Sequence, residues 1–172
     1  MDGWLTCKEA ELLWESASTT EGPILEVGVY KGRSTALLTG LGRLVHCVDP
    51  FAGFDSDDPS GDRVEASFLA GMKGNGITNF VLHRCRIEDW PRERVGFAYL
   101  DGDHTFEGTT GQLKVALESG AMTVCVHDYE TPPKGAQSEG GREIVRACME
   151  FPHLEVVQVA GHMACCRFKE MD

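Results

Sequence analysis

The sequence predicts an α/β fold in which seven strands form one open, doubly wound, mainly parallel sheet with helices on both faces, an α/β/α sandwich. Strand-like apolar runs alternate with helix-like runs through most of the 172 residues, an order typical of parallel sheets with crossover helices. Most strand-like runs are continuously apolar, as expected for strands buried on both faces. Only the last two follow each other directly, around Ala160 and Gly161, which predicts a hairpin and one antiparallel strand in the edge region.

Local patterns place each element in chain order. Short apolar runs between turn-forming residues predict strands at 24–29, 43–48, 80–83, 97–100, 121–126, 154–159 and 163–168. Apolar residues at helical spacing, in stretches closed by glycine or proline, predict helices at 5–18, 34–41, 64–72, 107–118 and 142–150. Stretches rich in Gly, Pro and Asp predict loops at 51–63 and 130–141. No repeat or linker divides the chain, so we expect one domain over 1–172, with its core over about 23–168.

The composition excludes several kinds of partner. With 27 acidic and 16 basic residues the net charge is −11, so binding to the phosphate backbone of nucleic acid is not expected. No apolar run approaches the roughly 20 residues that cross a bilayer, and the N-terminus lacks the apolar core of a signal peptide. The seven cysteines are odd in number and scattered, a pattern typical of reduced, mostly buried thiols in a cytoplasmic protein and not of a zinc site.

Glu26, Gly28 and Gly32 form the most informative motif. They end the first predicted strand and lead into the next helix, and Asp49 ends the second strand, 21 residues after Gly28. Glycines at such positions permit positive φ and close approach of the backbone to a ligand. An acid at the next strand end can accept hydrogen bonds from ribose hydroxyls. The motif therefore suits an adenosine cofactor, although its Gly-x-x-x-Gly spacing differs from the Gly-x-Gly-x-x-Gly of dinucleotide-binding proteins.

Further polar residues follow the other predicted strands. Ligands bind beyond the carboxyl ends of the strands in such sheets, near the point where the strand order reverses. The residues at these ends lie in the ranges 26–32, 49–51, 84–89, 101–104 and 127–129. We therefore expect a ligand site built from these five ranges.

These motifs together resemble the class I S-adenosylmethionine-dependent methyltransferases, whose fold is Rossmann-like. The resemblance covers residues from about 23 to 168 and includes the reversed strand of the terminal hairpin. Two segments are similar to a subgroup of small-molecule O-methyltransferases: the Asp-Gly-x-His sequence from Asp101 to His104, and the pair His127 and Asp128. The resemblance implies S-adenosylmethionine as the cofactor.

The resemblance also implies roles for individual residues. Asp49 would bind the ribose, and Glu26 would organise the loop near the methionine end of the cofactor. Ser34 equally suits a helix cap, and Phe51 equally suits a core position. The residues expected to bind the cofactor are Glu26, Gly28, Tyr30, Gly32, Ser34, Asp49, Pro50, Phe51, Ile87, Glu88 and Asp101.

Asp101 and Asp128 raise the question of a metal. If their strands are neighbours, the two carboxylates lie about 5 Å apart, and they repel unless they are protonated or bridged by a cation. Mg²⁺ is the ordinary bridging ion, and metal-dependent O-methyltransferases of the catechol type place ligands at these strand ends. His127 stands where an acidic ligand is usual, which favours a softer divalent cation. The sequence leaves metal dependence open.

Asp101, His104 and His127 are the expected catalytic residues. The near-neutral pKa of histidine suits proton removal from a hydroxyl. The remaining histidines lie away from these strand ends and are expected to be structural; they are His46, His83, His153 and His162.

The function predicted from these observations is methyl transfer from S-adenosylmethionine to a small-molecule acceptor, through a hydroxyl. Two alternatives stand beside it. One is a non-catalytic protein that binds S-adenosylmethionine, and the other is a nucleotide-dependent oxidoreductase, which the missing Gly-x-Gly-x-x-Gly disfavours. The sparse elements outside the core make a homodimer the expected assembly.

Overall fold

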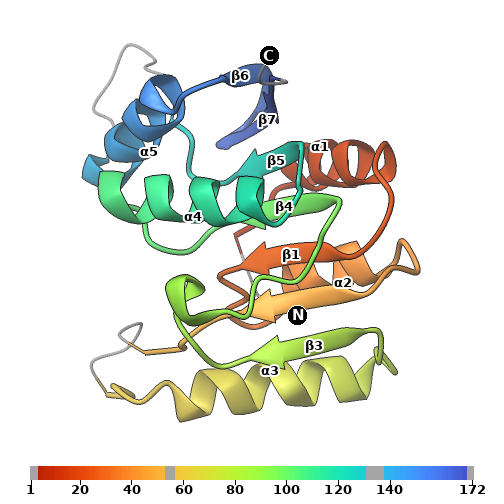
Figure 1. The fold of residues 1–172 in the computed structure, drawn as a ribbon. Helices are drawn as coiled ribbons and strands as arrows, with labels where there is room; N and C mark the ends of the chain where they lie inside the picture. Colours follow the sequence, from red (N-terminus) through yellow and green to blue (C-terminus); the bar gives the residue numbers. More distant parts are fainter. Residues whose placement is uncertain (1–3, 53–56, 131–137, 170–172) are drawn as a thin grey trace.

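The computed structural model describes residues 4–52, 57–130 and 138–169, and its strands form one seven-stranded sheet in the order β3-β2-β1-β4-β5-β7-β6 (Figure 1). The strands are β1 (Ile24–Val27), β2 (Val45–Val48), β3 (Phe80–His83), β4 (Phe97–Leu100), β5 (Thr123–Val126), β6 (Leu154–Ala160) and β7 (Met163–Phe168). Strands β1 to β5 pair in parallel, whereas β7 is antiparallel to β5 and to β6. The predicted fold class is confirmed, including the reversed strand near one edge.

Helices cover both faces of this sheet. The helices are α1 (Cys7–Ser18), α2 (Arg33–Thr39), α3 (Asp62–Gly74), α4 (Phe106–Glu118), α5 (Glu139–Glu150) and the 3₁₀ helix η1 (Ile87–Asp89). Side chains of α1, α2 and α3 share one hydrophobic core with Ile24 of β1. Those of α4, α5 and η1 share a second core with Leu25 and Val27. Successive side chains of a strand point to opposite faces, so β1 contributes to both layers.

Local chemistry explains where the elements begin and end. Helix α1 starts later than predicted because Thr6 caps it: its hydroxyl accepts from the Glu9 N–H at 3.4 Å, and the Glu9 carboxylate accepts from the Thr6 N–H at 2.7 Å. Strand β1 ends at Val27, before the prediction, because Gly28 turns the chain with φ +82°. Helix α5 begins at Glu139 because the Ser138 hydroxyl accepts from a backbone N–H in its first turn.

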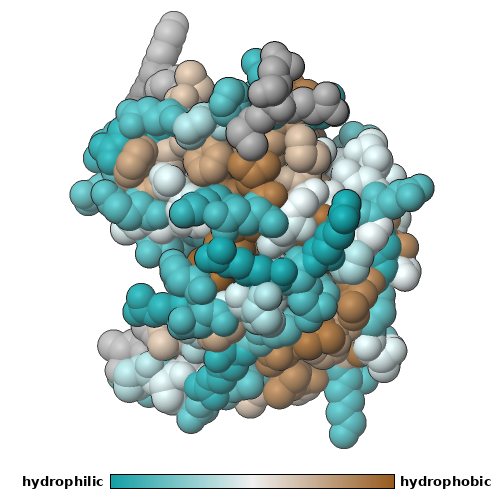
Figure 2. All heavy atoms as spheres, viewed as in Figure 1, coloured by the Kyte–Doolittle hydropathy of each residue, from teal (hydrophilic) through white to brown (hydrophobic). Residues whose placement is uncertain are grey.

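A loop segment, and not a helix, covers one face of β2 and β3. On the face packed by α4 and α5, the connection from β3 to β4 crosses β2 and β3, and its Trp90 lies against side chains of both strands. Val81 of β3 remains 41% exposed there, and Figure 2 shows hydrophobic side chains at the surface in the lower part of this view. Among the described residues, no helix is long and apolar enough to cross a membrane.

Candidate active site

Two cavities lie at the carboxyl ends of the central strands. The chain leaves β1 toward β2 and leaves β4 toward β5, in opposite directions along the sheet, so this is where the strand order reverses and where ligands bind in such folds. The smaller cavity has a volume of about 170 Å³ and the larger one about 280 Å³. Gly28 and Asp101 line both cavities. A ligand that lies across these two residues can therefore extend from one cavity into the other.

Gly28 is required by the backbone geometry at this junction. Its φ is +82°, and a Cβ placed on it would lie 2.1 Å from the carbonyl oxygen of Asp101. Gly32 also has a positive φ, but a Cβ there would meet the side chains of Met72 and Phe68 of α3. The first glycine of the motif therefore shapes the cavities, whereas the second lets α3 pack closely.

Glu26 and Ser34 form a buried pair behind the smaller cavity. The Ser34 hydroxyl donates to the Glu26 carboxylate at 2.5 Å, and Ser34 also lines the cavity. Gly32, not Ser34, is the N-cap residue of α2, so the capping interpretation of Ser34 is wrong. Glu26 is 0% exposed, and its burial raises its pKa to about 7. Glu26 lines neither cavity and holds Ser34 in place.

Asp49 joins the glycine loop to the larger cavity. Its carboxylate accepts from the N–H groups of Val29, Tyr30 and Phe51 at 2.8, 3.2 and 2.6 Å. It also lines the larger cavity. A carboxylate offers about four acceptor positions, so one position remains for a ligand hydroxyl. Phe51 is fully buried against Phe68 of α3, which supports its interpretation as a core residue.

The remaining predicted residues divide between the two cavities. Pro50, Ile87 and Glu88 line the larger one. Tyr30 lines the smaller one together with the strand-end residues Asp101, His104, His127 and Asp128.

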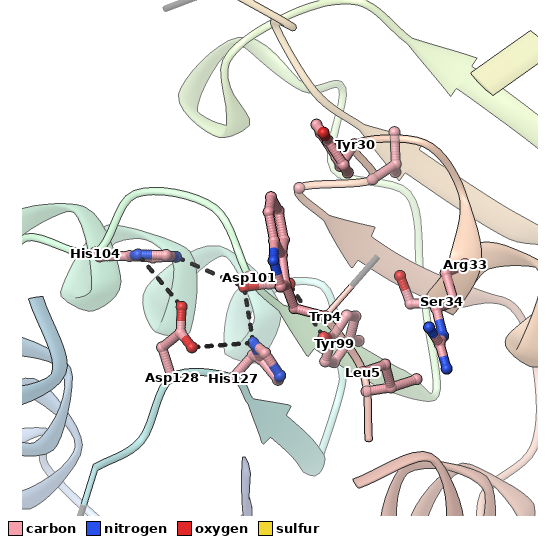
Figure 3. A pocket seen from close by; sticks show the side chains of 12 residues that line it. Trp4, Leu5, Tyr30, Arg33, Ser34, Tyr99, Asp101, His104, His127 and Asp128 are labelled. Atoms are coloured by element: carbon pink, nitrogen blue, oxygen red, sulfur yellow. Dashed lines mark hydrogen bonds and ion pairs between the residues drawn. The ribbon is translucent and has the colours of Figure 1, made fainter. Parts of the chain in front are cut away.

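The two histidines and two aspartates form one cluster. His127 Nδ1 lies 3.3 Å from Asp101 Oδ1 and 3.4 Å from Asp128 Oδ1. His104 lies 3.6 Å from each carboxylate, through Nε2 toward Asp101 and Nδ1 toward Asp128. Figure 3 shows the four side chains facing one another at the wall of the cavity. The sequence-based expectation that Asp101 and Asp128 lie close together agrees with this geometry.

Charge within the cluster determines its protonation. Burial opposes ionisation of Asp101, but interactions with His104 and His127 lower the pKa of this carboxyl. Burial also opposes a charged His127, yet Asp101, Asp128 and Glu9 raise its pKa to about 9. The hydrogen bond with Asp101 raises the pKa of His104 despite partial burial. His127 is therefore protonated at neutral pH in the absence of a ligand.

Glu9 is a supporting residue that the sequence analysis did not identify. It is buried on α1, and its carboxylate lies 3.8 Å from His127 Nε2. The same carboxylate accepts from the N–H groups of Thr6 and His162 at 2.7 Å each. The Thr-x-x-Glu sequence at 6–9 is a recognisable capping box, but its second contact with His127 depends on how α1 packs against the sheet.

Aromatic residues complete the smaller cavity. Trp4 is 72% exposed and stacks on Tyr30 with ring centroids 5.1 Å apart. Figure 3 shows Trp4 between the histidine–aspartate cluster and Tyr30. The Tyr99 hydroxyl donates to Asp101 Oδ2 at 3.1 Å. Trp4 belongs to no motif, and Tyr99 lies two residues before the Asp-Gly-x-His sequence without a role predicted for it, so the folded structure identifies both contacts.

Asp101, His104 and Asp128 each offer one metal-ligand atom, and these atoms lie within 4.8 Å of one another. The set adds an imidazole to the two predicted carboxylates. Mixed nitrogen and oxygen donors suit Zn²⁺, Mn²⁺ or Fe²⁺ better than they suit Mg²⁺, which prefers oxygen.

Solved structures with the same fold include proteins whose structures contain a cofactor or its product. Cofactor-bound Rv0187 from MTB has a TM-score of 0.72 and 15% identity, over 98% of this chain and 83% of that chain. The SAH-bound methyltransferase PaMTH1 of Podospora anserina has a TM-score of 0.70 and 14% identity, over 94% and 78%. An O-methyltransferase of Bacillus cereus in complex with SAH has a TM-score of 0.68 and 13% identity, over 96% and 83%.

These likenesses establish the Rossmann-like fold of the chain over nearly its whole length. No protein-family model matches the sequence. No curated protein matches it either.

Proposed function

We propose that this chain is an S-adenosylmethionine-dependent methyltransferase that acts on a hydroxyl of a small molecule. The observation that carries the proposal is the junction of the two cavities at Gly28 and Asp101. The larger cavity has Asp49, Ile87 and Glu88 in its wall and suits the adenosine portion of the cofactor. The smaller cavity contains the histidine–aspartate cluster and suits the acceptor. SAH-bound solved structures of the same fold support this assignment.

Three residues would hold the cofactor. The remaining acceptor position of Asp49 would bind a ribose hydroxyl, and the carboxylate of Glu88 would accept from the adenine amino group. Gly28 keeps the loop backbone next to the tip of β4, where the methionine portion would pass. S-adenosylmethionine, when bound, supplies a methyl group on a positively charged sulfur that an acceptor oxygen attacks.

The histidine–aspartate cluster would prepare that oxygen. An acceptor hydroxyl must lose its proton as the methyl transfers, and His127 can accept it only after losing its own. Because the pKa of His127 is about 9, we expect turnover to rise with pH up to that value. The cluster also positions the acceptor beside Asp101, and positioning alone can supply much of the acceleration.

A divalent cation bound at the histidine–aspartate cluster is a separate part of this proposal. Asp101, His104 and Asp128 would hold it, and it would lower the pKa of the acceptor hydroxyl. Dialysis against a chelator and readdition of Mg²⁺, Mn²⁺ or Zn²⁺ tests this element. Activity that survives the chelator would assign proton removal to the histidines alone.

Cofactor binding tests the function directly. We expect calorimetry at tens of micromolar protein to detect S-adenosylmethionine and SAH. Asp49→Asn should weaken binding at least tenfold, whereas Asp89→Asn, a neighbouring acid outside both cavities, should not change it. Thermal melts followed by circular dichroism show whether each variant is folded. Failure of the wild-type protein to bind either compound would exclude the proposal.

Two measurements separate the alternatives. Binding of reduced nicotinamide cofactor, followed by fluorescence, would favour an oxidoreductase. Binding of SAH without methyl transfer to any hydroxylated acceptor in a labelled-methyl screen would favour a non-catalytic binding protein. Light scattering during gel filtration tests the proposed homodimer. The seven cysteines are odd in number and scattered along the chain, which suits a reducing compartment, and we propose the cytoplasm.

A further inference from the structure

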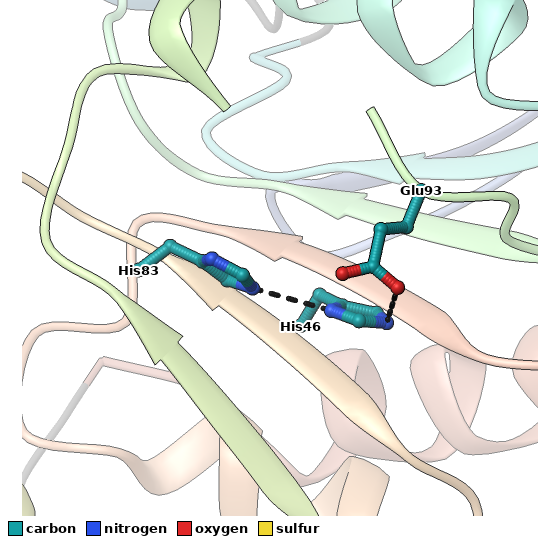
Figure 4. Close-up of side chains that lie close together, drawn as sticks. All are labelled: His46, His83 and Glu93. Carbon is teal, nitrogen blue, oxygen red and sulfur yellow. Dashed lines mark hydrogen bonds and ion pairs between the residues drawn. The ribbon is translucent and has the colours of Figure 1, made fainter. Parts of the chain in front are cut away.

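A second cluster of metal-ligating side chains lies away from both cavities. His46 of β2, His83 of β3 and Glu93 of the connection between η1 and β4 approach one another there (Figure 4). In the β2–β3 register, His46 pairs with Val81, and Val48 pairs with His83. His46 and His83 therefore point to the same face of the sheet. This is the face that the β3–β4 connection covers in place of a helix.

The spacing of the three side chains suits a metal ion. His46 Nδ1 and His83 Nε2 share a hydrogen bond in this structure and are 3.2 Å apart. Two nitrogens bound to Zn²⁺ at about 2.0–2.1 Å with a tetrahedral angle lie about 3.3 Å apart. The nearest carboxylate oxygen of Glu93 is 3.7 Å from His46 Nε2. One ligand atom from each of the three residues falls within a group whose members lie within 4.8 Å of one another.

His46 is also incompletely satisfied within the protein. It is only 2% exposed, and its Nε2 makes no hydrogen bond to the described residues. A buried polar nitrogen in this state is unfavourable. His83 faces Nδ1 and Glu93 faces Nε2 of this ring, so the imidazole must turn, or the 54% exposed Glu93 side chain must rotate, before a single nitrogen of His46 and both partners can bind one ion.

We propose that His46, His83 and Glu93 bind one divalent transition-metal ion of the Zn²⁺ type, with each residue giving one ligand and water completing the coordination. Two imidazoles and one carboxylate form a donor set typical of Zn²⁺ and of Fe²⁺, not of Mg²⁺ or Ca²⁺. The ion would fasten the β3–β4 connection to β2 and β3. The same connection carries Ile87 and Glu88 of the larger cavity, so the ion would hold that cavity wall in place.

Trp90 gives this site its own spectroscopic reporter. Its ring is buried, with its centroid 5.9 Å from that of His46 and 6.2 Å from that of His83. Co²⁺ replaces Zn²⁺ in such sites and quenches a nearby indole. The variant Trp4→Phe with Trp14→Phe leaves Trp90 as the only tryptophan of the three in the chain.

The experiment titrates this variant protein with Co²⁺ and then displaces the ion with Zn²⁺. We expect one equivalent to quench Trp90 and Zn²⁺ to restore its fluorescence. Adding His83→Gln or Glu93→Gln should weaken binding at least tenfold, whereas His153→Gln, a histidine outside the cluster, should have no effect. Adding Asp101→Asn with Asp128→Asn removes the other candidate metal cluster and should leave the quenching unchanged.

Three results would overturn the proposal. They are no quenching by Co²⁺ in the folded protein, equal affinity in His83→Gln and Glu93→Gln, or a thiolate-to-cobalt charge-transfer band, which would place the ion on cysteine. None of these measurements uses methyl transfer or cofactor binding. The metal site can therefore fail while the proposed function stands, and the reverse also holds.

Discussion

Replacing Gly28 with alanine tests whether the junction of the two cavities depends on this glycine. The new Cβ would lie 2.1 Å from the carbonyl oxygen of Asp101 and 2.6 Å from its carbonyl carbon. These atoms belong to the backbone at the tip of β4, so no side-chain rotation relieves the overlap. The carbonyl must retreat by about 0.9 Å merely to reach 3.0 Å, the shortest separation that real Cβ atoms show.

The magnitude follows from two contributions. A left-handed backbone costs alanine about 1–2 kcal/mol, and displacement of packed backbone adds about 1–3 kcal/mol, the usual cost of overpacking. We therefore expect Gly28→Ala to lower the free energy of unfolding by about 2–5 kcal/mol. Gly42 provides the matched control, because its φ is +72° but a Cβ there meets nothing within 4 Å. Gly42→Ala should lose only the backbone contribution.

Urea denaturation measures the free energy of unfolding of both variants, and calorimetry measures their affinity for SAH. Below the unfolding transition, Gly28→Ala should bind SAH at least tenfold more weakly because the Asp101 tip has moved, whereas Gly42→Ala should bind it like the wild type. Equal losses of stability in the two variants, or unchanged SAH binding by Gly28→Ala, would refute the reasoning.

Three further predictions concern the same site. Burial raises the pKa of Glu26 from 4.5 to about 7, so folding favours its protonated form, and about 3 kcal/mol of stability is present below pH 4.5 and lost as the pH rises through 7. Glu26→Gln should therefore be more stable than the wild type in urea at pH 8, and a lower stability would contradict this. Burial opposes a charged His127, but Asp101, Asp128 and Glu9 raise its pKa from 6.5 to about 9. The protonated His127 therefore contributes about 3 kcal/mol to the free energy of unfolding below pH 6.5, and this contribution is lost as the pH rises through 9. The stability of the wild type should fall relative to that of His127→Gln between these pH values, and parallel stability curves would contradict this. Trp4→Ala should raise the acceptor KM about fivefold, since a stacked indole contributes about 1 kcal/mol, while the affinity for SAH stays constant. Steady-state kinetics test this, and an unchanged KM would contradict a role for Trp4 in acceptor binding.

The fold was predictable because its signals are local. Continuous apolar strands such as Phe97–Leu100 are short and bounded by turn-forming residues, and burial on both faces of a parallel sheet leaves this pattern in the residues themselves. The boundaries of the elements were predicted less accurately than their kinds. The start of α1 depends on the reciprocal hydrogen bonds of Thr6 and Glu9, and the spacing of apolar residues, from which the helix was predicted, does not mark that position.

The sequence by itself determined the kind of site: the glycine turn at Gly28, the acid at Asp49 and the paired strand ends that carry His104 and His127. Each of these lies next to a strand end, and a parallel sheet brings such ends to one edge whatever the side chains do. Only the tertiary structure decided the partners that come from distant segments. It placed Glu9 behind His127, and it turned His46 and His83 from expected structural residues into a candidate metal cluster. Such contacts depend on which faces of the elements pack together and on how closely they approach, and the order of the residues alone does not specify these distances.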